Sequence, residues 1–365
     1  MSTRMQASAG RKEPGAQEFE VTLVIDPAPL KRLPLRVGPF QVIQGMLSLA
    51  DDGAKQYIQR RFGPDFKEDW FSKGFPALVL RVWAVDHNEA VRTAFDLGNV
   101  VADFLVLGLG ISYAAFDLAP DTPLRVLSGV FVRRVDEAEP KLYRYHREVL
   151  GYINTDGQVA VQRQAFDTAT LPKLTEKIPP SVFREEPTEV QLRLRRAIHW
   201  AAQSRRARPL ASRFLLSWTA LESLTASPQD KRRKKGEIVR TRLAQLVLKH
   251  GWQGAPEQLL NRLWLLRHQL VHEAVTGYFD AEAGHAREIG SLLWATHYFF
   301  LLALILAIDS CETASSIVDM WGRVADYSPS IILSPDELPV RHLFVEWMEG
   351  EEGDFQQLSN FQRPC

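Results

Sequence analysis

Cysteine is scarce in this sequence, which has only two in 365 residues, Cys311 and Cys365. Two cysteines cannot form a disulfide framework or a zinc ribbon, so we expect a reducing, cytoplasmic location. Long hydrophobic runs are scarce too. The longest run, 292–308, includes Thr296 and His297. A membrane span needs about 20 apolar residues, so this run is too short. We therefore expect no membrane association and interpret this run as a buried helix.

The sequence also lacks net charge, because 44 Lys and Arg balance 44 Asp and Glu. The balance is uneven along the chain. Residues 187–309 contain 18 Lys and Arg against 10 Asp and Glu, a net charge of +8, and the remainder carries 26 against 34, a net charge of −8. A basic segment within a neutral chain favours an anionic partner for that segment.

Hydrophobic periodicity predicts an α+β fold, with a mixed α/β domain followed by an all-helical domain. Four prolines punctuate the polar boundary between the two domains, at positions 172, 179, 180 and 187. The expected divisions are a flexible arm at 1–18, an α/β domain at 19–172, a linker at 173–187, a helical domain at 188–310, and a C-terminal extension with an acidic tail at 311–365.

Alternating or β-branched runs predict strands in the first domain, and Asp86 three residues before Glu89 predicts a helix start. The expected strands are 19–25, 78–85, 111–116, 124–135 and 158–162, and the expected helix ends near residue 107. Gly108 and Gly110 then follow a helix instead of a strand, which excludes a dinucleotide-binding turn and favours a helix C-cap. The expected helices of the second domain are 188–205, 209–226, 236–250, 256–273 and 281–309.

Two helices of the second domain each direct one charge towards the core. On a helical wheel Arg267 lies at the centre of the apolar arc of 259–273, with His268 and His272 at its edge. Glu222 lies inside the apolar arc of 209–226. A lone buried charge is very unfavourable, so we predict that Glu222 and Arg267 form an ion pair. This pair is either purely structural or, with two histidines beside it, functional.

His268 and His272 are four residues apart, as in zinc proteases of the H-E-x-x-H type. Gln269 stands where that motif needs a general base, and no third ligand is evident, so we expect no metal site and no cofactor.

The stretch from Arg267 to His272 matches the R-x4-6-H motif of HEPN domains, and the upstream residues 213–222, RFLLSWTALE, resemble the Ala-Leu-Glu helix of the ApeA-like HEPN branch. Many HEPN domains are metal-independent endoribonucleases. The resemblance, which covers residues 188–310, implies that Arg267 and His272 are catalytic, that Glu222 supports them, and that His268 and Gln269 line the site. It also implies RNA as the substrate, in phage defence or toxin-like growth arrest.

A basic run precedes the third helix of this domain and is either a solvated loop or a contact for RNA phosphates. It consists of Lys231, Arg232, Arg233, Lys234 and Lys235. Arg267 and His272 lie about 140° apart on an ideal helix. Either the helix ends near Leu270, or a homodimer through the helical domain completes the site. The helix 281–309, apolar nearly all round, must likewise lie centrally or be covered by a second copy.

The sequence leaves other functions open. A non-catalytic HEPN module that binds RNA, a nucleotide or a partner protein is the alternative to the nuclease, and a purely structural helical dimerisation unit is a third hypothesis. The N-terminal domain is expected to have a sensing or positioning role, and a regulatory partner bound to this domain is compatible with that role.

Overall fold

The fold is α+β in a computed structural model of the chain. The structure describes residues 14–25, 35–37, 40–44, 76–112, 126–136, 141–144, 177–183, 186–207, 210–230, 234–251, 256–273 and 283–332. These residues belong to two compact units, Met1–Arg206 and Ala207–Cys365. The sheet lies in the first unit, and the described elements of the second unit are helical. The predicted acidic tail and most of the predicted arm lie outside the described residues.

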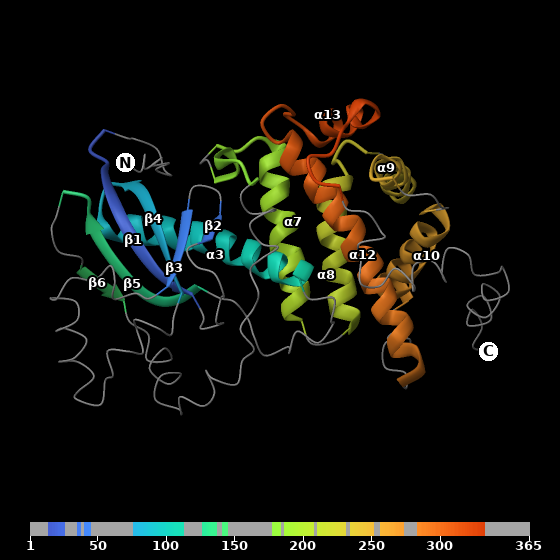
Figure 1. The fold of residues 1–365 in the computed structure, drawn as a ribbon, viewed down its shortest axis with the longest axis horizontal. Helices are drawn as coiled ribbons and strands as arrows, with labels where there is room; N and C mark the ends of the chain where they lie inside the picture. Colours follow the sequence, from blue (N-terminus) through green and yellow to red (C-terminus); the bar gives the residue numbers. More distant parts are fainter. Residues whose placement is uncertain are drawn as a thin grey trace. The chain divides into compact units, whose positions relative to one another are not determined.

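Six described strands form one antiparallel sheet in the order β2-β3-β4-β1-β5-β6 (Figure 1). Their bounds are β1 Gln17–Ile25, β2 Leu35–Val37, β3 Phe40–Gln44, β4 Pro76–Ala84, β5 Val126–Arg134 and β6 Lys141–Arg144. The alternation of β1 buries Phe19, Val21 and Leu23 on one face. On the other face Glu20 lies opposite Arg81 of β4 and Arg133 of β5 in register and forms an ion pair with each. The central strands are thus joined by a core on one face and by charge on the other.

Helix α3 (His87–Ser112) packs on β1, β4 and β5. It begins where the sequence predicted, because Asp86 caps it: the Asp86 carboxylate accepts a hydrogen bond from the Glu89 N–H at 2.8 Å. The Glu89 carboxylate in turn accepts from the Val85 N–H at 2.8 Å. This reciprocal pair fixes the turn from β4 into α3.

The strands around 19–25, 78–85 and 124–135 are confirmed, and three other predictions change. Residues 111 and 112 continue α3, so the strand predicted at 111–116 is wrong there, and its remainder and the strand at 158–162 lie outside the described residues. Gly108 and Gly110 lie inside α3 and not in a C-cap. Strands β2, β3 and β6 were not predicted, because runs of three to five residues are too short for an alternation to be recognised.

The segment predicted as a linker is partly core. Its described residues include a 3₁₀ turn, η1 (Pro180–Phe183), whose Val182 and Phe183 are buried, and Ile178 is buried as well. The Phe183 ring lies edge-on to Phe40 of β3 at 4.8 Å between ring centroids. Helix α7 (Glu189–Arg206) follows and packs on α3, so it belongs to the first unit and not, as predicted, with the later helices.

Four later helices match their predicted positions closely: α8 Leu210–Thr225, α9 Lys235–Lys249, α10 Pro256–His268 and α12 Ala283–Ser310. Helix α13 (Ile317–Gly322) was not predicted and lies in the segment expected to be a C-terminal extension. Helix α12 is the core of the unit, since every side chain from Tyr298 to Ile308 is buried. It packs against α8, α9 and α13. None of the helices in the described part of the chain has the length and hydropathy needed to span a membrane.

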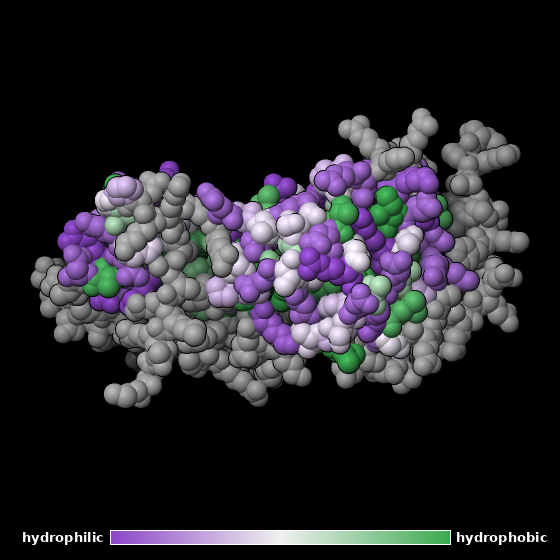
Figure 2. All heavy atoms as spheres, turned by 90° about the horizontal axis from the view of Figure 1, so that it is seen from above, coloured by the Kyte–Doolittle hydropathy of each residue, from purple (hydrophilic) through white to green (hydrophobic). Residues whose placement is uncertain are grey.

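The burial of α12 bears on the predicted homodimer. The sequence required this helix either to lie centrally or to be covered by a second copy, and the single chain already covers it. The face seen in Figure 2 shows hydrophobic residues of the described chain as separate small patches among hydrophilic ones. The apolar helix therefore no longer argues for a dimer, and the homodimer stays a prediction.

Polar contacts fix the ends of the helices. Arg242 of α9 forms an ion pair with Asp230 at 2.9 Å, and its guanidinium also donates to the Thr225 carbonyl at 2.5 Å, which ties the α8–α9 connection to α9. Trp321 of α13 donates its indole N–H to the Leu224 carbonyl at 2.7 Å. This bond satisfies a carbonyl at the C-terminal end of α8 and anchors α13 there.

We predict that acid destabilises the fold through His250, at the end of α9. Burial lowers the pKa of His250 from 6.5 to about 4, with Asp309 opposing part of the shift. Between these values the unfolded chain binds more protons than the folded chain, so the free energy of unfolding falls as pH drops from 6.5 to 4. Urea denaturation across this interval measures the fall. His250→Gln should show a shallower fall, and parallel curves for the two proteins would contradict the prediction.

Candidate functional site

The predicted pair of Glu222 and Arg267 is present. Helix α8 supplies Glu222 and α10 supplies Arg267, and the Arg267 Nε lies 3.8 Å from the Glu222 Oε1. The same oxygen accepts a hydrogen bond from the indole N–H of Trp218 at 2.9 Å. Trp218 is one turn before Glu222 on α8 and is fully buried, so the indole orients the carboxylate towards α10.

The pair is less buried than the sequence indicated. The side chains of Arg267 and Glu222 retain 23% and 17% of their exposure. A helical wheel places both residues towards the core, but long side chains extend their charged ends to the edge of the apolar arc. Both side chains therefore remain partly accessible to solvent, which a binding or catalytic role requires and a fully buried structural pair lacks.

Aromatic rings support the pair from both helices. The Arg267 Cζ lies over the Trp264 ring, 5.5 Å from its centroid, in cation–π geometry. The Trp264 and Trp218 rings are 6.0 Å apart and tilted. Trp264 fits because position 236 in α9 is glycine: a Cβ there would lie 2.3 Å from Cζ2 of the Trp264 ring. Gly236 thus lets α9 and α10 approach closely enough for Trp264 to lie under the arginine.

His272 lies on a different kind of backbone from Arg267. The α-helix ends at His268, and residues Gln269–Glu273 form one π-helical turn, η3. A π turn bonds residues five apart, so it contains one residue more than an α turn. Positions 267 and 272, five apart, therefore lie closer to a common face than the about 140° of an ideal α-helix. One predicted way to bring Arg267 and His272 together was for the helix to end near Leu270. The α-helix does end close to there, at His268, but the chain continues as a π turn.

The other predicted site residues are distributed as follows. His268, the last residue of α10, is exposed, and Gln269, the first of η3, is half-buried. Lys234 is exposed and Lys235 begins α9, whereas 231–233 lie outside the described residues. In the described part of the chain, no group of three or more His, Cys, Asp or Glu is placed to hold a metal ion.

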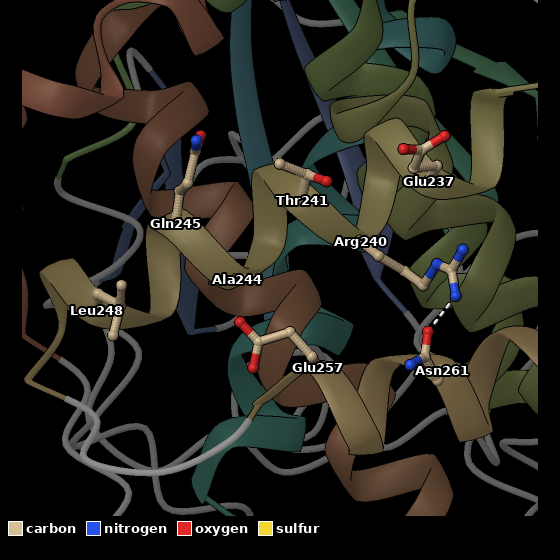
Figure 3. Close-up of a pocket in the computed structure, with 8 residues that line it drawn as sticks. All are labelled: Glu237, Arg240, Thr241, Ala244, Gln245, Leu248, Glu257 and Asn261. Atoms are coloured by element: carbon tan, nitrogen blue, oxygen red, sulfur yellow. Dashed lines mark hydrogen bonds between the residues drawn. The ribbon is translucent and has the colours of Figure 1, made fainter.

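An open cavity lies between α9 and α10 but contains none of the predicted site residues (Figure 3). Glu237 and Arg240 of α9 and Glu257 and Asn261 of α10 line it, and Arg240 donates a hydrogen bond to Asn261. Two carboxylates beside one engaged arginine leave this cavity with a negative balance, so it does not suit an RNA phosphate.

The residues that support the pair, Trp264 and Gly236, were not predicted from the sequence. Trp264 is three residues before Arg267, a spacing that places the two side chains together on a helix and predicts their stacking. Gly236 did not indicate a close helix contact, because glycine is also common near the start of a helix for other reasons.

Comparison with known proteins gave no match: no family model fits the chain, and no curated protein or solved structure resembles it detectably.

We predict that Gly236→Ala destabilises the protein by about 1–3 kcal/mol, because the new methyl must displace the rigid Trp264 ring or separate α9 from α10. Gly322→Ala is the matched control, since a Cβ at position 322 meets nothing within 4 Å. Chemical denaturation measures both variants. Equal stabilities for the two variants would show that the α9–α10 contact is not tight.

We predict that Glu222→Ala costs about 1–3 kcal/mol of stability, less than a fully buried pair would lose, mainly because it leaves the buried Trp218 indole N–H without an acceptor. Glu222→Gln keeps that acceptor and loses only the partly exposed ion pair, so it should cost below about 1 kcal/mol. Thermal and urea unfolding of both variants separates the two terms. A glutamine variant as unstable as the alanine variant would mean that the ion pair dominates.

Proposed function

We propose that this chain is a metal-independent endoribonuclease of the HEPN type, with Arg267 and His272 as catalytic residues and Glu222 as the residue that positions Arg267. The observation that supports it best is the accessible Glu222–Arg267 pair on two packed helices, next to the π turn that carries position 272. The HEPN unit is proposed to comprise residues 188–310, of which α8, α9, α10 and α12 lie in the second unit.

The residue types suit RNA cleavage. RNA carries its own nucleophile, the ribose 2′-OH, and histidine transfers protons near neutral pH, so His272 would serve as general base or acid. A guanidinium stabilises the phosphate as negative charge accumulates on it. Glu222 and Trp264 hold the guanidinium of Arg267 in one orientation before substrate arrives. This arrangement reduces the conformational entropy that the arginine loses when it binds a phosphate.

One observation favours the alternative of a non-catalytic HEPN module. The Glu222 carboxylate already compensates part of the charge on Arg267, so a phosphate must compete with it. A module that binds RNA, a nucleotide or a partner protein would need only this accessible pair and no general base. The two functions differ in whether His272 is required.

Single-residue variants test the nuclease. Arg267→Ala and His272→Ala should each lower cleavage of RNA in EDTA by at least about 100-fold, with the fold retained by circular dichroism. The matched control is Arg323→Ala, which removes an exposed arginine of the same unit that pairs with Asp319. The products should end in a 2′,3′-cyclic phosphate or its hydrolysis product, because the 2′-OH attacks.

Two outcomes would contradict the nuclease. Cleavage only on addition of a divalent metal would refute the mechanism. RNA binding without cleavage, equal in wild type and His272→Ala, would establish the non-catalytic module instead. Growth arrest on expression of the wild type, relieved by His272→Ala, would support the proposed role in phage defence or toxin-like arrest.

A further inference from the structure

The surface of α7 in the first unit is strongly basic. The helix contains five arginines and one glutamate. Arg193 pairs with Glu189 at 3.4 Å, Arg195 donates to the Val182 carbonyl, and Arg206 pairs with Asp103 at 2.6 Å. Arg196 is exposed and forms no ion pair with any described residue. The helix therefore exposes positive charge to solvent that the described ion pairs do not compensate.

Arg196 belongs to a line of polar and aromatic side chains along one face of α7. Residues 196, 199, 200 and 203 follow the i, i+3, i+4, i+7 spacing of a single helix face. Arg196, His199 and Trp200 are exposed, and Gln203 is half-exposed. We call these four residues the α7 stripe. Trp200 retains 37% of its residue exposure, so a large aromatic side chain beside a cation and an imidazole is accessible to a ligand.

A buried carboxylate holds one member of the stripe in place. Asp103 of α3 retains 7% side-chain exposure, and its Oδ2 lies 3.0 Å from the Nδ1 of His199. An ionised carboxylate only accepts hydrogen bonds, so Nδ1 carries the proton, and Nε2 is on the opposite edge of the ring. The His199 side chain is 51% exposed, which leaves that edge available to a ligand. The His199 ring also contacts Trp200 edge-on at 5.5 Å between centroids.

We propose that the α7 stripe is a docking surface for single-stranded RNA. A base stacks on Trp200, a neighbouring phosphate contacts Arg196, and the Nε2 of His199 accepts a hydrogen bond from a base N–H. A cation in line with an exposed aromatic ring matches the charge and the base faces of an unpaired strand, and a duplex cannot present those faces. The choice of RNA rests on the proposed function, whereas the mode of docking rests on the stripe alone. The stripe is in the first unit, and Arg267 and His272 are in the second.

Fluorescence anisotropy tests the docking surface in the full-length protein. The probe is a labelled 2′-O-methyl oligouridine of about a dozen nucleotides, studied in EDTA. Its blocked 2′ position prevents cleavage, so binding is measured whether or not the protein is a nuclease. Trp200→Ala should weaken binding at least about fivefold, and Trp200→Phe should retain most of the affinity because it keeps a ring for stacking. A duplex of the same length should bind more weakly than the single strand.

A matched pair of arginine variants separates a local phosphate contact from the effect of overall charge. Arg196→Ala should weaken binding and reduce the slope of log affinity against log salt by about 0.7. Arg92→Ala removes an equal charge from the same unit at a side chain that is 75% exposed, and it should change neither quantity. Thermal unfolding confirms that each variant is folded.

Several outcomes would overturn the docking surface. They are absence of binding by the wild type, unchanged affinity of Trp200→Ala, equal effects of the two arginine variants, or equal affinity for the duplex. Failure of the proposed nuclease is distinguishable from these. Loss of binding in the stripe variants of a chain that cleaves no RNA would leave the stripe standing and refute the nuclease. RNA cleavage by the chain together with unaltered binding by the stripe variants would leave the nuclease standing and refute the stripe.

Discussion

The need to bury α12 on every side determines the second unit. A helix that is apolar all round cannot lie on a surface, so α8, α9 and α13 pack around it. Helix α10 then packs against α9 and α8 at the edge of this core. The Glu222–Arg267 pair lies where α10 meets α8, at the margin of the apolar core. This position explains how two charges that point inward on their helices still retain access to water.

Small and large side chains cooperate at this margin. Gly236 removes a side chain from α9, Trp264 occupies the space, and Arg267 lies over the ring. On the other helix Trp218 fixes the carboxylate that faces the arginine. Each charge therefore has an aromatic partner that restricts its motion. Loss of either ring would therefore lower stability through lost aromatic packing. The same restriction gives the guanidinium the fixed orientation that a phosphate-binding group needs.

Sequence patterns predicted the long elements well and the irregular ones poorly. Helices α8, α9, α10 and α12 and strands β1, β4 and β5 have enough turns or alternations for a period to be recognised, whereas the six residues of α13 do not. Opposite charges inside two apolar arcs were enough to predict the Glu222–Arg267 pair. The π turn at Gln269–Glu273 and the core position of Val182 depend on tertiary packing, which a local pattern does not contain. The Asp103–His199 contact joins residues 96 positions apart, so no local spacing indicates it.

The sheet has its shortest described strands at its two borders. Strands β2 and β6 have three and four residues, whereas β1, β4 and β5 have nine each and lie inside. A border strand displays unpaired backbone groups to which a strand of another molecule can bond, and the number of such bonds grows with its length. Strand β1 is paired along most of its length on both sides, whereas β3 covers β4 only at Pro76–Val79 and β6 covers β5 only at Val130–Val132. Each described border strand therefore offers only three or four residues on which a strand of another copy could pair.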